Sequence, residues 1–194
     1  MIDRPLPPIQ SLPVSAHSSQ NTIANLIRFL VACLAIVIGT SQARADLGAF
    51  IAFLMIAMHF RTHPTLLAEY KTVTVTLVIG TFWEFCLLKG GVLRYEGTVA
   101  FSLVPMWVVS FWAALGTTFN GCFAWGKSHL VTIPVLAGLI GPLLTYGGSR
   151  LGILSVGHGL HGYLIIAGGW AVLSVTLFFL ADYFFRTSES IQRG

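Results

Sequence analysis

The sequence predicts an all-α membrane protein, a polytopic bundle of about six transmembrane helices, on the strength of two observations. Of its 194 residues, 55% are hydrophobic and only 9% are charged, whereas soluble domains carry charge on about a quarter of their residues. The apolar residues also gather into runs close to the ~20 residues that a helix needs to cross a bilayer. So few charges cannot cover a soluble surface, and the lipid bilayer is therefore the expected surrounding.

Three regions follow from the composition along the chain. Residues 1–22 hold four prolines among polar residues, which predicts a flexible tail because proline interrupts a helix. The transmembrane domain is expected over 23–185, and a short polar tail over 186–194. The six predicted spans cover approximately residues 23–41, 47–60, 70–89, 99–124, 130–148 and 161–184.

The first span allows a second interpretation. Arg28, the apolar run after it and the small residues Ala43 and Ala45 follow the charged, hydrophobic and A-x-A order of a secretory signal. Cleavage after Ala45 would leave five spans. The long proline-rich leader before the run argues against cleavage, but the alternative stays open.

The next two spans need individual arguments. Residues 47–60 are short for a full crossing, so we expect a tilted helix or a locally thinned bilayer. Residues 72–76 alternate threonine and valine in the manner of a strand. A helix is favoured there because an open strand leaves its backbone unpaired in lipid.

The fourth and fifth spans contain prolines, and the fifth also contains a pair of small residues. Pro105, Pro134 and Pro142 would loosen their helices locally. Ala137 and Gly141 form a small-xxx-small step that suits close helix contact.

The cations between the spans predict the orientation. Six alternating spans place two groups of cations on opposite sides: Arg4, Arg61, Lys71, Lys127, Arg186 and Arg193 against Arg44, Lys89, Arg94 and Arg150. Because the cytoplasmic side carries more lysine and arginine, both termini are expected in the cytoplasm.

Glu84 is the residue that most strongly suggests a site. It lies inside the third apolar run, and ionisable residues within a membrane commonly mark function. The predicted topology brings it toward the outer side, where we expect a polar pocket with these candidate partners: Arg150, His158, His161 and Tyr146. The alternative is structural, a protonated Glu84 or a buried ion pair that fixes helix packing.

The other polar residues predict structure rather than chemistry. We expect hydrogen bonds among Thr117, Thr118 and Asn120, or from them to a neighbouring helix, because an amide that faces lipid without a partner is costly. His59, Arg61 and His63 lie across a predicted helix end, which favours solvation at the membrane interface.

We expect no metal and no cofactor. His158 and His161 are spaced to share a helix face, but catalytic zinc takes three protein ligands and the flanking glycines suggest a loop. The three cysteines are widely spaced and are interpreted as small buried hydrophobic residues. The cations stand singly, so nucleic-acid binding is not indicated.

Three motifs between Trp107 and Gly152 resemble a known family. They are WAALGTTFN at 112–120, GPL at 141–143 followed by Tyr146, and GSRLG at 148–152. This segment is similar to an uncharacterised family of small polytopic bacterial inner-membrane proteins, a domain of unknown function. Looser similarity extends over about residues 24–184.

The resemblance implies a multi-pass protein of the bacterial inner membrane. It implies that Glu84, Arg150 and the residues Thr117, Thr118 and Asn120 match polar positions of the family. The chain departs from the family pattern at Gly121, where the family usually has histidine, and any role of that histidine is therefore not expected here. The family supplies no established activity.

Three classes of function fit the sequence. A non-catalytic envelope protein that packs against a membrane partner, or against a second copy of itself, explains the small-residue faces and is favoured. A permease subunit for a small solute or lipid would explain an intramembrane carboxylate. A membrane enzyme acting on lipid would use Glu84 or His158 as a general base, with Arg150 on a phosphate.

Overall fold

The structure, a computed structural model, describes residues 14–62, 66–95 and 104–193 as a bundle of helices. Within these ranges, five helices are long and apolar enough to cross a membrane, and the predicted transmembrane helical bundle is therefore confirmed. Its elements are α1 (Val14–Ser41), α2 (Ala45–Thr62), α3 (Leu66–Lys89), β1 (Leu93–Tyr95), α4 (Met106–Gly116), the 3-10 helix η2 (Ala124–Ser128), α5 (Thr132–Arg150), β2 (Leu154–Val156) and α6 (Leu160–Arg193).

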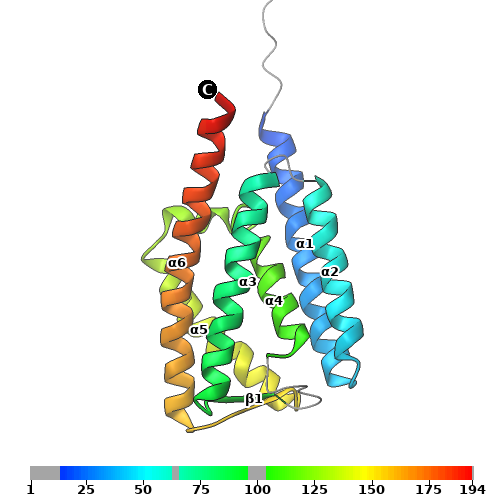
Figure 1. Cartoon of the computed structure of the whole chain (residues 1–194), viewed down its shortest axis with the longest axis vertical. Helices are drawn as coiled ribbons and strands as arrows, with labels where there is room; N and C mark the ends of the chain where they lie inside the picture. The colour runs from blue at the N-terminus through cyan, green and yellow to red at the C-terminus, as the bar shows by residue number, and fades with distance from the viewer. Residues whose placement is uncertain (1–13, 63–65, 96–103, 194) are drawn as a thin grey trace, which may run out of the picture.

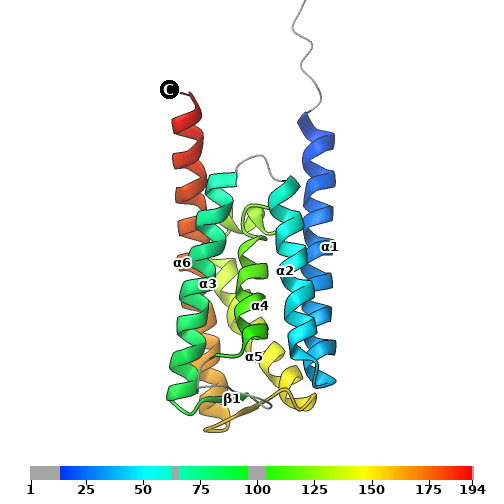
Figure 2. The same ribbon diagram turned by 45° about the vertical axis from the view of Figure 1, so that its right-hand side comes forward.

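Four of the long helices form two antiparallel pairs, and α3 and α4 lie between the pairs. α1 packs on α2 and α5 packs on α6, while α4 lies against α2 and α3, and α3 also packs on α6 (Figure 1). α1 begins and α6 ends at the same end of the bundle, which we call the terminal end (Figure 2). The two strands lie at the opposite end, the ribbon end.

The fourth predicted span is the main difference between prediction and structure. A single crossing was expected over 99–124, but the helix occupies only Met106–Gly116, and residues 117–123 form turns that lead into η2. Residues 99–103 lie outside the described ranges. α4 packs against α1, α2 and α3, so the irregular backbone after it is covered by protein, where departures from helix are tolerated at membrane depth.

Both predicted tails contain helix where the structure describes them. α1 already begins at Val14, directly after Pro13, because the residues that follow are compatible with a helix once the prolines end. α6 continues through the predicted C-terminal tail to Arg193. Asp182 and Arg186 form an i,i+4 ion pair of 2.7 Å in its last turns, which supports the helix there. Residues 1–13 and 194 lie outside the described ranges.

Glycines end the two helices that lead into the ribbon. Gly91 after α3 and Gly152 after α5 adopt positive φ angles of 67° and 68°, which glycine tolerates without steric cost. Each end is closed by a backbone bond that spans the glycine, from Val92 N to the Leu87 carbonyl and from Ile153 N to the Gly148 carbonyl. The chain thereby turns into β1 and β2.

The two strands pair antiparallel, and their register determines where Tyr95 lies. Leu93 faces Val156 across the ladder, and Tyr95 faces Leu154. The alternation of side chains along β1 leaves Arg94 exposed and buries its two neighbours. The strand pairing therefore places the buried side chain of Tyr95 at the ribbon end of the bundle.

Candidate functional site

Glu84 lies on the inner side of α3 and has two hydrogen-bond donors from other elements. Its side chain is 6% exposed, so the carboxylate faces the bundle, as the sequence argument expected. The Tyr95 hydroxyl of β1 donates to Oε2 over 2.5 Å, and the indole Nε1 of Trp112 in α4 donates to Oε1 over 3.3 Å. The shorter distance lies within the usual range of an O–H···O hydrogen bond.

Tyr95 is well held by its surroundings. Its side chain is buried and its ring meets the edge of Trp107 at 5.3 Å between ring centroids. Burial, followed by the nearby Glu84 carboxylate, raises the pKa of the Tyr95 phenol well above its usual value. The phenol therefore stays protonated and keeps donating to Glu84 at neutral pH.

The predicted partners of Glu84 lie elsewhere. Tyr146, Arg150, His158 and His161 are all exposed, and among the described residues no ion pair or hydrogen bond joins any of them to Glu84. His158 precedes α6 with a positive φ of 61° and contacts the Gly90 carbonyl at 3.3 Å. Water at the end of the bundle can hydrogen-bond these polar side chains, which costs less free energy than burying them would.

A cavity of about 670 Å³ extends beside Glu84, with walls from α1, α4, α5 and α6. Its lining is mainly apolar and includes Phe119 and Phe178. Glu84, close to the last residue of α3, and Tyr95 of β1 line its ribbon end. The volume is within the range of small-molecule sites, about 300–1,000 Å³.

The cavity opens between α1 and α5. These helices pack on different partners, α1 on α2 and α5 on α6. Lining residues from both helices are exposed, namely Leu30 and Val37 of α1 and Leu136, Ile140 and Leu144 of α5. The opening is therefore lateral and apolar, on a surface of the transmembrane helices.

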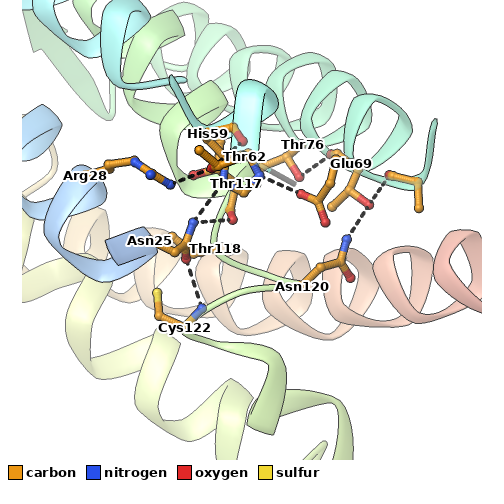
Figure 3. A network of polar contacts seen from close by, with 12 residues as sticks. Asn25, Arg28, His59, Thr62, Glu69, Thr76, Thr117, Thr118, Asn120 and Cys122 are labelled. Carbon is orange, nitrogen blue, oxygen red and sulfur yellow. Dashed lines mark hydrogen bonds and ion pairs between the residues drawn. The ribbon is translucent and has the colours of Figure 1, made fainter. Parts of the chain in front are cut away.

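A second polar centre, drawn in Figure 3, includes the last turn of α2 and the first turn of α3, which lie toward the terminal end (Figure 1). Asn25 of α1, His59 of α2 and Glu69 of α3 are each at most 3% exposed. The Asn25 amide nitrogen lies 3.1 Å from His59 Nδ1 and donates to the Thr117 carbonyl over 2.9 Å. His59 Nε2 lies 2.9 Å from Glu69 Oε2. Three helices and the turn after α4 are thus joined by buried polar contacts.

The hydrogen-bond pattern determines the form of His59. The Cys122 backbone N–H donates to Asn25 Oδ1 over 2.9 Å, which identifies that atom as oxygen. The Asn25 nitrogen then has its two protons for Thr117 and His59, and Nδ1 of His59 must accept. His59 is therefore neutral with its proton on Nε2, which it donates to Glu69.

Asn120 connects this region to Lys127. Its amide nitrogen donates to the Thr72 hydroxyl of α3 over 3.3 Å, and its oxygen accepts from Lys127 Nζ over 2.6 Å. The expected contact between Asn120 and a neighbouring helix is therefore present. Thr117 and Thr118 instead donate to carbonyls of α4. Burial lowers the pKa of Lys127, an effect that nearby Asp182 and Glu69 oppose.

The sequence interpretation missed the second centre. His59 was expected to be solvated at the interface, but it is 1% exposed. Arg61 is exposed as expected, and His63 lies outside the described residues. The sequence pattern that could have revealed the pair is a histidine and a glutamate ten residues apart, on either side of a short connection between two helices. Because the two helices run in opposite directions, this spacing places both side chains at the same depth.

Comparison with known proteins supports the family resemblance. A family model described as "Protein of unknown function (DUF2878)" matches residues 22–176, and the chain belongs to this family. The predicted membership of an uncharacterised family is thereby confirmed. Searches of curated proteins and of solved structures gave no match. The family carries no stated activity, and any function must be argued from the geometry.

Proposed function

We propose that this family member binds a lipid-like molecule, which enters its cavity sideways from a bacterial inner membrane. The observation that carries the proposal is the apolar cavity of about 670 Å³, whose lateral mouth lies between α1 and α5 and whose ribbon end holds a buried carboxylate. An apolar site with a few convergent polar groups is the usual form of a small-molecule site.

The surroundings of the mouth favour an amphiphile from the bilayer. Leu30 on α1 and Ile140 on α5 line the cavity and are exposed, and both belong to helices suited to cross a membrane. Lipid chains would contact these side chains in any case. A chain that moves from the bilayer into the cavity exchanges one apolar surrounding for another, while its polar end gains the groups at Glu84.

The binding role is non-catalytic in this proposal. Both oxygens of Glu84 accept hydrogen bonds from Tyr95 and Trp112, which holds the carboxylate in place as part of a preformed site. Such a protein would present or sequester a lipid for the envelope. A second copy or another membrane protein that covers the face between α1 and α5 is the competing occupant.

The proposal is tested by closing the cavity with a larger side chain. Ala137 of α5 lines the cavity, and Leu139, two residues on, is 66% exposed and does not line it. Native mass spectrometry of the full chain, purified in a mild detergent, should detect a bound lipid. Ala137→Phe should deplete that lipid at least tenfold, whereas the matched control Leu139→Phe should retain it.

Two results would overturn the proposal. One is a chain without any bound lipid, even after incubation with a total bacterial lipid extract. The other is a mass of two copies, with a dimer that Ala137→Phe dissociates, since the cavity face would then be an interface between copies.

A further inference from the structure

The charge on the cavity wall points to the chemistry of the ligand's polar end. Among the described residues that line the cavity, Glu84 is the one carboxylate, and there is no lysine, arginine or histidine. An anionic end, such as a phosphate or a carboxylate, would meet the buried Glu84 without a compensating cation. A buried anion without a compensating cation is strongly unfavourable.

The hydroxyl groups of the lining also lack free protons. Tyr95 donates its proton to Glu84, Thr145 donates to the Gly141 carbonyl over 2.9 Å, and Ser174 donates to the Ala171 carbonyl over 2.8 Å. Each hydroxyl oxygen keeps lone pairs, and the two Glu84 oxygens offer about four acceptor positions, of which Tyr95 and Trp112 use two. These oxygen-bearing side chains therefore present acceptors to a ligand.

The depth of Glu84 limits the size of the polar end. Glu84 precedes Lys89, the last residue of α3, by five positions, which corresponds to about 7 Å along the helix axis at 1.5 Å per residue. The carboxylate therefore lies below the end of its membrane span. A small group reaches it more readily than a bulky head group, which would have to leave the interface.

We infer that the ligand is a long-chain amphiphile whose small polar end donates hydrogen bonds and carries no negative charge, a hydroxyl or an ammonium group, held by Glu84 and Tyr95. This inference rests on the proposed function, because it assigns the ligand class of the same cavity. The acceptors at the ribbon end, the absence of a cation in the described lining and the depth of Glu84 together carry it.

A series of compounds with the same chain separates the possible polar ends. Hexadecanol, hexadecylamine, palmitate and hexadecyl phosphate, each brominated on the chain, are titrated into the full chain in detergent. Trp112 and Trp170 line the cavity, so a bound brominated chain should quench tryptophan fluorescence. The alcohol, the amine or both should bind at least tenfold more tightly than the two anions.

Glu84 variants identify the charge that is recognised. Glu84→Gln keeps a carbonyl acceptor but removes the negative charge, so it should leave alcohol binding within about threefold and weaken amine binding at least tenfold, a loss of about 1.4 kcal/mol. Asp46→Asn is the matched control, because Asp46 is an exposed carboxylate outside the lining, and it should change neither affinity. Gel filtration and circular dichroism establish that each variant is folded.

The outcomes distinguish this inference from the proposed function. Binding of palmitate or hexadecyl phosphate as tightly as of hexadecanol overturns the ligand class but leaves lipid binding intact. If the protein prefers the amine and Glu84→Gln does not lower its affinity for the amine, the ligand class is also overturned. Failure of every compound to quench, together with a chain that carries no lipid, overturns the proposed function itself.

Discussion

His59 of α2 and Glu69 of α3 share a 2.9 Å hydrogen bond in the interior, where their side chains are 2% and 0% exposed. The bond links the last turn of α2 to the first turn of α3, whereas Glu84 lies near the other end of α3. The neutral tautomer that Asn25 imposes on His59 makes it a donor to the glutamate. The part of the chain that the structure describes thus contains two buried carboxylates with different partners.

Loss of the His59 donor should destabilise the fold. His59→Leu removes a hydrogen bond to a buried acidic group, which is worth about 1.5–3 kcal/mol, and the free energy of unfolding in mixed micelles should fall by that amount. His161→Leu is the control, since His161 is exposed and exposed positions usually change stability by less than about 0.5 kcal/mol. Equal effects of the two changes would show that the buried bond contributes nothing.

Asn25 should determine the tautomer of His59. In the wild-type protein, imidazole nitrogen NMR should show a neutral ring with the proton on Nε2, because the Asn25 amide occupies Nδ1 as a donor. Asn25→Asp replaces that donor by an acceptor, and an oxygen of the aspartate can still accept from the Cys122 N–H. The substitution should therefore favour a proton on Nδ1 of His59. An unchanged His59 spectrum would contradict the assigned network.

Glu84 should tolerate an amide but not an apolar side chain. Glu84→Gln keeps one oxygen that can accept from Trp112, and its amide N–H can donate to the Tyr95 hydroxyl oxygen. It should therefore cost less than Glu84→Leu, which leaves two buried donors unpaired at about 1–3 kcal/mol each. Adding Tyr95→Phe to Glu84→Leu should restore part of the loss. Arg150→Gln is the control. It should leave the free energy of unfolding nearly unchanged, because Arg150 is exposed and shares no described interaction with Glu84.

Tyr95 should make the protein less stable in strong alkali. The pKa of its phenol is raised in the folded state, so the unfolded chain loses this proton first, near the ordinary value of about 10. The contribution of Tyr95 is present below that pH and is lost as the pH rises toward the folded pKa. The thermal midpoint of the wild type should therefore fall more steeply above about pH 10 than that of Tyr95→Phe. Parallel curves would refute the assignment.

Both ends of the chain should face the cytoplasm. In a variant without native cysteines, Arg186→Cys at the terminal end and Arg94→Cys in β1 place thiols at two exposed positions. A membrane-impermeant maleimide should label residue 94 in intact cells or spheroplasts, and residue 186 only after permeabilisation, since the terminal end carries the richer set of loop cations. The opposite pattern would reverse the orientation.

The membrane spans were largely predictable because they follow from hydrophobicity and length. The second span, expected over 47–60, is α2 (Ala45–Thr62), and the fifth, expected over 130–148, is α5 (Thr132–Arg150). The fourth differed because α4 packs against neighbouring helices. A helix that faces lipid and a helix that is buried in protein both have an apolar sequence. The apolar run could therefore not show that a central helix would end at Gly116.

The candidate site was less predictable, because its partners come from distant positions. The sequence singled out Glu84 as an unusual carboxylate, but Tyr95 reaches it through the pairing of β1 with β2, and Trp112 through the packing of α4 against α3. Arg150 shared the expected depth with Glu84 yet lies exposed. Depth along a helix follows from residue numbers, whereas the direction of a side chain around the bundle does not.

By itself, the sequence therefore determined the membrane environment, most of the helices and the presence of one exceptional acidic residue. Only the tertiary structure decided that Glu84 is held by neutral donors, that His59 and Glu69 meet in the interior, and that a cavity opens between α1 and α5. The physical reason is that hydrophobicity acts locally along the chain. Hydrogen-bond pairing and cavities depend on how separate helices are rotated and spaced against one another.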